Sequence, residues 1–148
     1  MTKDIVIMTN KFVIFGKVRL MKRNTRRPTD AELTILQVLW DRGPSTVREV
    51  YKILNSGKDV GYTTVLKVMQ IMTDKALVER DESCRPQLYR PRLPREQTQR
   101  QLIKDLADRA FGGSAKRLVM QALEEKKASV SELAQIEKLL NRLERGEK

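Results

Sequence analysis

Hydrophobic residues recur at three- and four-residue intervals in six stretches of the chain, which is the spacing of amphipathic helices. Three of these stretches follow a capping box, in which a hydroxyl residue precedes a glutamate by three positions and begins a helix. The boxes are Thr29–Glu32, Thr46–Glu49 and Ser129–Glu132. The first two helices are expected to end at Gly43-Pro44 and at Asn55-Ser56-Gly57, because these residues favour helix ends and turns.

The pattern changes after the third helix, which is expected over residues 62–75. Residues 77–80 and 87–90 have the character of short strands, and they flank a turn-rich tip at 81–86. Two such stretches separated by turn residues predict a β-hairpin. The expected order in this part of the chain is therefore helix, helix, helix, hairpin.

Three further helices are expected after Pro94. The first stops at Gly112-Gly113, Ser114 is placed to cap the second, and the third follows Ser129. We therefore predict a mainly α fold in three parts. They are a basic N-terminal arm at 1–27, a first domain at 28–93 and a second, helical domain at 94–148.

The charge of the chain is concentrated at its beginning. The 148 residues include 30 Lys and Arg and 19 Asp and Glu, which gives a formal net charge of +11. Residues 1–27 carry eight basic side chains and one acidic side chain (+7), residues 28–93 carry ten and nine (+1), and residues 94–148 carry twelve and nine (+3). A basic excess favours a polyanionic partner, but the near balance of 28–93 means that the positions of its charges matter more than their sum.

The composition also excludes several chemistries. Without histidine the chain has no Ser-His-Asp triad and no histidine metal ligands, and one cysteine excludes an intrachain disulfide or a multi-cysteine zinc site. No carboxylate cluster or glycine-rich phosphate loop is evident, so we expect neither an enzyme nor a bound metal or cofactor. The scarcity of cysteine fits the cytoplasm.

Residues 1–20 differ in character from the rest of the chain. Two short apolar runs, Ile5–Met8 and Phe12–Phe15, are too short for a signal peptide or a membrane span, so membrane insertion is not expected. A β-hairpin, a disordered arm and a translation start at Met21 are three alternative interpretations. A chain that starts at Met21 would have a net charge of +8.

The third helix separates its residues onto two faces when they are placed at 100° intervals. The apolar stripe consists of Val65, Val68, Met69, Met72 and Ala76. The opposite face carries Thr63, Lys67, Gln70 and Asp74, with Thr64 beside it. Threonine, lysine and glutamine can contact phosphates or base edges, so this face suits a recognition helix in the major groove. A merely solvated face is the plainer interpretation, and Asp74 favours it because a carboxylate repels phosphate.

Four arginines surround the predicted hairpin. They are Arg80, Arg85, Arg90 and Arg92. A β-wing with arginine at its tip can contact the DNA backbone or the minor groove, although an ordinary hairpin with solvated arginines has the same pattern. Arg48, near the start of the second helix, is a further candidate for a backbone contact. Together with the outward face of the third helix, these residues predict a winged helix-turn-helix that binds double-stranded DNA.

Four separated motifs resemble the penicillinase and methicillin-resistance repressor family, in that family's order. They are PTDAELTILQVLWDRGPSTVREVYKIL, GYTTVLKVMQIMTDKALVER, LYRPRLPRE, and FGGSAKRLVMQALEE followed by SVSELAQIEKLLNRLE. The resemblance covers nearly all of residues 28–145. It implies a homodimeric repressor whose N-terminal winged helix binds a palindromic operator and whose C-terminal helices dimerise. Thr63, Thr64 and Lys67 match the start of the family's recognition helix.

The apolar residues after Pro94 also indicate a dimer, because so few helices cannot bury all of them within one chain. The surplus consists of Phe111, Leu118, Val119, Leu123, Leu133, Ile136, Leu139, Leu140 and Leu143. A twofold partner would cover these residues and would set two recognition helices about 34–36 Å apart, one turn of the duplex. Packing back onto the winged helix within one subunit is the alternative.

The family's two release mechanisms find no match in this chain. The β-lactam-responsive members are cleaved at an Asn-Phe bond, and the corresponding dipeptide here is Asp105-Leu106. The copper-responsive members use Cys-x-Cys pairs, which are absent. Cys84 at the hairpin tip, beside Arg85, is either a redox-sensitive thiol or an incidental surface cysteine.

A second class of function fits the same pattern. A winged helix can serve as a protein-interaction module without sequence-specific DNA binding, and the basic arm would then dock on acidic partners. The absence of saturable DNA binding at moderate salt would favour this alternative.

Overall fold

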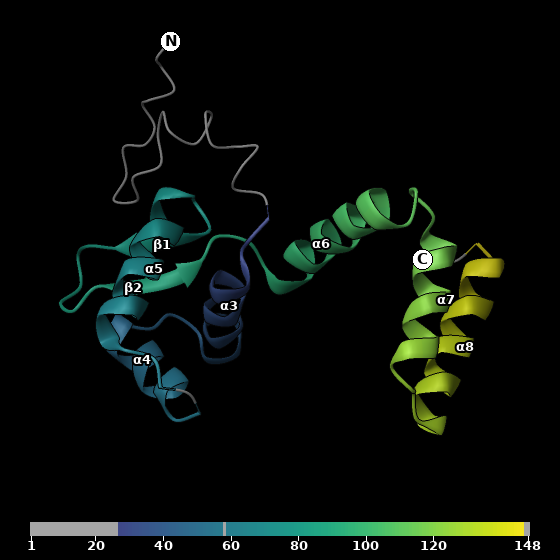
Figure 1. Ribbon diagram of the computed structural model, residues 1–148, viewed down its shortest axis with the longest axis horizontal. Helices are drawn as coiled ribbons and strands as arrows, with labels where there is room; N and C mark the ends of the chain where they lie inside the picture. The colour runs from purple at the N-terminus through teal and green to yellow at the C-terminus, as the bar shows by residue number, and fades with distance from the viewer. Residues whose placement is uncertain (1–26, 58, 147–148) are drawn as a thin grey trace, which may run out of the picture. The chain divides into compact units, whose positions relative to one another are not determined.

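The computed structural model describes residues 27–57 and 59–146. The helices are α3 (Asp30–Arg42), α4 (Val47–Asn55), α5 (Tyr62–Asp74), α6 (Arg95–Ala110), α7 (Ala115–Glu125) and α8 (Val130–Glu144), and the strands are β1 (Val78–Asp81) and β2 (Leu88–Pro91) (Figure 1). This is the predicted order of elements, and it confirms a mainly α winged-helix fold. The predicted N-terminal arm lies, apart from Arg27, outside the described residues, so the three interpretations of residues 1–20 stay predictions.

The three expected capping boxes are all formed. The Thr29 hydroxyl accepts a hydrogen bond from the Glu32 amide at 3.2 Å, and the Glu32 carboxylate accepts one from the Thr29 amide at 2.9 Å. Thr46 and Glu49 make the same pair of bonds at the start of α4, and Ser129 and Glu132 do so at the start of α8. Each box pairs two backbone amides that the first helical turn would otherwise leave without partners.

The core of the first part lies between α3, α4, α5 and the hairpin. Its buried residues are Ile35, Leu36, Leu39, Val47, Val50, Val65, Met69, Met72, Val78 and Tyr89. The predicted stripe of α5 faces this core, although Val68 is only half-buried. Because burial of each large apolar side chain contributes about 1.5–3 kcal/mol, this stripe fixes which face of α5 points outward.

A buried serine joins the hairpin to the helices. Strands β1 and β2 pair antiparallel, with Val78 opposite Pro91 and Asp81 opposite Leu88. The backbone of Ser45, in the connection between α3 and α4, exchanges two hydrogen bonds with Tyr89 of β2, at 3.0 and 2.8 Å. Ser45 is completely buried and Tyr89 is 3% exposed. The wing is therefore held by backbone hydrogen bonds to the same connection that leads into α4.

The chain forms two compact units, and the division falls inside α6, between Leu102 and Ile103. The sequence pattern placed the boundary at 93/94, where the helix begins. The first turns of α6 belong to the first unit because residues at and just before the start of α6 are bonded to α3. The Trp40 indole donates to the Leu93 carbonyl at 3.1 Å, and the Arg95 guanidinium forms an ion pair with Asp41.

The second unit, residues 103–146 of the described chain, is thinly packed. Neither α7 nor α8 contains a buried residue. Gly112 and Gly113 end α6 with positive φ angles of 59° and 81°, a conformation that glycine adopts without strain. Across residues 27–57 and 59–146, no helix combines the length and the apolarity needed to cross a bilayer.

Candidate nucleic-acid interface

The outward face of α5 is exposed along its whole length. Thr63, Thr64, Lys67, Gln70 and Asp74 are all exposed, as the helical spacing predicts. Gly61 precedes the helix without a side-chain cap, and the first turn contains no acidic residue. The first amides of α5 are therefore not capped by a side chain and its positive dipole end is not neutralised by an acidic residue in the first turn, which favours an anion such as a DNA phosphate.

One apolar residue on this face was missed by the sequence analysis. Ile71 is 41% exposed and lies four residues after Lys67, hence on the same side of the helix. The signal that could have found it is the position of Ile71 outside the apolar stripe. In a major groove such a side chain can contact a thymine methyl group.

Arg48 of α4 is held beside the start of α5 by aromatic rings. Its guanidinium carbon lies 4.8 Å from the centre of the Tyr62 ring, in cation–π geometry. Tyr51 packs edge-on against Tyr62, with 5.6 Å between the ring centres and 80° between their planes. The structure thus brings Arg48 to the first turn of α5, next to Thr63. The two tyrosines were not predicted as part of the site, although the spacing of Arg48 and Tyr51 places them on one side of α4.

The far end of α5 is anchored by a buried ion pair. Lys75, the residue that ends the helix, donates to both carboxylate oxygens of Glu32, at 2.9 and 3.0 Å. The Glu32 side chain is 4% exposed and the Lys75 side chain is 17% exposed. The pair ties the C-terminal end of α5 to the N-terminal turn of α3. Sequence reasoning assigned Glu32 only to a capping box and did not find its lysine partner.

The wing arginines do not form one cluster of unpaired cations. Arg80 contacts Glu82 at 2.6 Å, and Arg90 contacts Glu79 at 3.1 Å. Partial burial disfavours the charge of Arg80, but hydrogen bonds to Glu82 and Tyr89 outweigh it and raise the pKa of the guanidinium. The predicted wing contacts from Arg80 and Arg90 are therefore weakened by acidic neighbours within the hairpin itself.

Arg85 and Arg92 differ from the other two arginines. Arg85 is exposed and donates to the carbonyl oxygens of Glu82 and Cys84, at 3.2 and 3.4 Å. Hydrogen bonds to neutral carbonyls leave its full charge available to a phosphate. Arg92 is exposed just after β2. Arg85 at the tip is thus the strongest wing candidate for a backbone contact.

Among the described residues, no basic side chain is paired with the Cys84 thiol, as a reactive thiol would require. The sulfur is half-buried and lies 3.7 Å from a carboxylate oxygen of Asp81. Arg85 directs its guanidinium to carbonyl oxygens and not to the thiol. The geometry favours the interpretation of Cys84 as an incidental cysteine.

A helix-turn-helix whose third helix exposes a polar face, followed by an antiparallel wing, defines a winged-helix DNA-binding protein. The sequence pattern of the penicillinase repressor family matches residues 28–142, and the chain belongs to this family. It is 31% identical over 119 residues to the transcriptional regulator BlaI of Mycobacterium tuberculosis strain CDC 1551, an alignment that covers 79% of this chain and 85% of that protein. The same protein of strain H37Rv gives the same values. The resemblance inferred from the four motifs is confirmed, and the chain is a DNA-binding transcriptional repressor and not an enzyme.

Proposed function

We propose that this repressor acts as a homodimer in the cytoplasm, where it binds a palindromic operator with one α5 helix in the major groove of each half-site. The observation that carries the proposal is the composition of the exposed α5 face, where Thr63, Thr64, Lys67 and Gln70 lie together around Ile71. Arg48 at the start of α5 and Arg85 at the wing tip flank this face and would hold the DNA backbone.

Exposed apolar residues in the second unit support the dimer. All nine residues predicted for the interface are at least partly exposed, including Leu133 (48%), Leu140 (54%) and Leu143 (55%). Ile103, Leu106, Met120 and Val130, which were not predicted for the interface, are exposed by 49–86%. So many exposed apolar residues favour an interaction site, and a second copy of the chain offers the same residues in return.

Base recognition by α5 predicts a specific loss in two variants. Lys67→Ala and Gln70→Ala should each lower the affinity for the operator by about 1–3 kcal/mol, because each removes donors to base edges. Filter binding or fluorescence anisotropy at fixed salt measures this loss. Lys126→Ala is the matched control, because Lys126 is an exposed lysine that ends α7 and should be neutral. Parental affinity in both α5 variants would refute the assignment of the recognition face.

The pairing within the wing predicts different salt effects for two arginines. Arg85→Ala should reduce the slope of log K against log salt concentration by about one per protomer, because one phosphate contact is lost. Arg80→Ala should change the slope by less than about half of that, because Glu82 already neutralises Arg80. Binding measured between 50 and 300 mM salt gives both slopes. A larger change for Arg80→Ala would contradict the assignment.

The sequence lacks the residues that the family's two known release devices use. The dipeptide Asp105-Leu106 lies within α6 in place of the Asn-Phe cleavage pair, and the chain contains no Cys-x-Cys pair. A different route to release is therefore expected, and a cleft lined by residues of α3 and α6 is a candidate site for a signal.

A further inference from the structure

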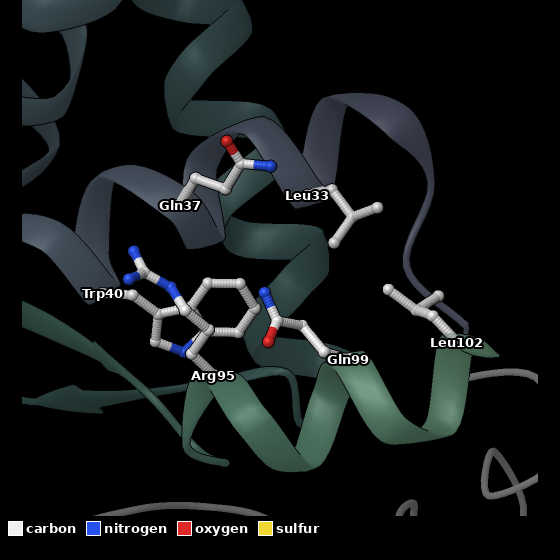
Figure 2. A pocket seen from close by; sticks show the side chains of 6 residues that line it. All are labelled: Leu33, Gln37, Trp40, Arg95, Gln99 and Leu102. Atoms are coloured by element: carbon white, nitrogen blue, oxygen red, sulfur yellow. The ribbon is translucent and has the colours of Figure 1, made fainter. Parts of the chain in front are cut away.

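A cleft lies between α3 and the first turns of α6, away from the α5 face. Its volume is about 430 Å³, within the range of small-molecule sites. Its lining consists of Leu33, Gln37, Trp40, Arg95, Gln99 and Leu102 (Figure 2). All six residues belong to the first compact unit.

The cleft is built from two matching helical stripes. Three residues of α3 and three of α6 follow the spacing i, i+4, i+7, so each stripe lies on one side of its helix. The leucines Leu33 and Leu102 lie at one end, as Figure 2 shows, and Trp40 with Arg95 lie at the other. The indole plane is fixed because its nitrogen donates to the Leu93 carbonyl at 3.1 Å. The cleft thus has a rigid aromatic wall and an apolar end.

The polar groups of the cleft favour an anion. Arg95 is the only charged residue of the lining, and its guanidinium carbon lies 5.7 Å from the centre of the Trp40 ring. One terminal nitrogen of Arg95 is paired with Asp41, and within the described residues no hydrogen bond occupies its other two nitrogens. The Gln37 and Gln99 side-chain amides likewise have no protein partner within the described part of the chain, so they can bond a ligand.

We propose that this cleft binds a small aromatic carboxylate that acts as an effector of the repressor. The ring of the ligand packs on the Trp40 indole, where aromatic contacts add to simple burial. Its carboxylate accepts hydrogen bonds from the remaining donors of Arg95 and from the Gln99 amide. Asp41 competes with the ligand carboxylate for Arg95. Mutation of Asp41 removes this competitor and therefore tests the site.

The effector role rests on the proposed function. The cleft lies at the root of α6, the helix that leads from the first unit into the second. A ligand between α3 and α6 can favour one geometry of that connection over another. If DNA binding also distinguishes the two geometries, the ligand changes the affinity for DNA, and DNA changes the affinity for the ligand by the same factor.

Binding is tested on the full chain with benzoate as the probe. Trp40 is the only tryptophan, so its fluorescence reports on the cleft directly, and calorimetry gives the affinity. We expect saturable binding with a dissociation constant on the order of 1 mM for benzoate, a ligand of nine heavy atoms. Tighter binding is expected for 2-naphthoate. Cyclohexanecarboxylate has the same charge without an aromatic ring and should bind several-fold more weakly.

Three variants locate the site. Arg95→Gln should weaken benzoate binding about 10-fold or more, since a charged hydrogen bond is lost. Asp41→Asn should tighten it up to about fivefold, because it releases Arg95 from an exposed ion pair. Arg92→Gln is the matched control, because Arg92 is exposed, lies outside the cleft and should leave binding unchanged. Absence of saturable binding for both aromatic acids, or equal binding by the parent and Arg95→Gln, overturns the proposal.

The effect on DNA is read separately. Saturating benzoate should change the operator affinity at least fivefold in the parent and not in Arg95→Gln, with cyclohexanecarboxylate at equal concentration as the salt control. Benzoate that binds in the cleft but leaves the operator affinity within twofold overturns the effector role. If the chain bound no duplex at all, the fluorescence titration would still test whether the cleft binds benzoate. Failure of the proposed DNA-binding function is therefore distinguishable from failure of the cleft proposal.

Discussion

Replacing Lys75 with methionine is expected to lower the free energy of unfolding by about 3 kcal/mol or more. Glu32 is 4% exposed and both of its carboxylate oxygens are bonded to Lys75. Methionine retains much of the side-chain volume but leaves the carboxylate buried without a cationic partner, which typically costs about 3–5 kcal/mol. Urea denaturation at pH 7 measures the loss as a lower midpoint with an unchanged slope.

Two further variants make this result specific to the ion pair. Lys67→Met changes the same residue type on the exposed face of α5 and should stay within about 0.5 kcal/mol of the parent. Combining Glu32→Gln with Lys75→Met should recover much of the lost stability, because no buried charge is then left unpaired. A Lys75→Met protein as stable as the parent would mean that the pair does not anchor α5.

The second large effect is expected at the exposed apolar residues of α8. Leu140→Asp should convert the dimer to a monomer at micromolar concentration, because a carboxylate would have to be buried within an apolar interface. Operator affinity should then fall about 100-fold or more, since the two half-sites are no longer bound by one linked assembly. Analytical ultracentrifugation measures the first change and fluorescence anisotropy the second.

The control for this variant is Asn141→Asp. It adds the same charge one residue further along α8, at an exposed position on the side away from the predicted apolar stripe, and should leave both the dimer and the operator affinity unchanged. Helix content measured by far-ultraviolet circular dichroism shows whether α8, which contains Leu140 in the second unit, is still folded in Leu140→Asp. A Leu140→Asp protein that sediments as a dimer would contradict the proposed interface.

Local features of this fold could be predicted from the sequence because short stretches of chain determine them. The capping boxes at Thr29, Thr46 and Ser129 and the positive-φ glycines after α6 all form where the pattern predicted them. The outward face of α5 followed from the 3.6-residue period, because a continuous apolar stripe leaves only one side of a helix for solvent.

Long-range pairings could not be predicted in this way. Glu32 and Lys75 are 43 residues apart, so no local pattern links them. Arg90 is paired with Glu79 across the hairpin, a contact that only the strand register reveals. The two compact units divide inside α6, and Trp40 and Asp41 of α3 hold the start of that helix. A helix start in a sequence does not reveal such contacts.

Selection of bound sequences from random duplex DNA by the full-length chain tests the central claim most directly. The account predicts a palindrome whose half-sites are centred one turn apart, about 34–36 Å, bound by two chains with a steep dependence on salt. Enrichment of no sequence, or of an asymmetric site bound by a single chain, would contradict it.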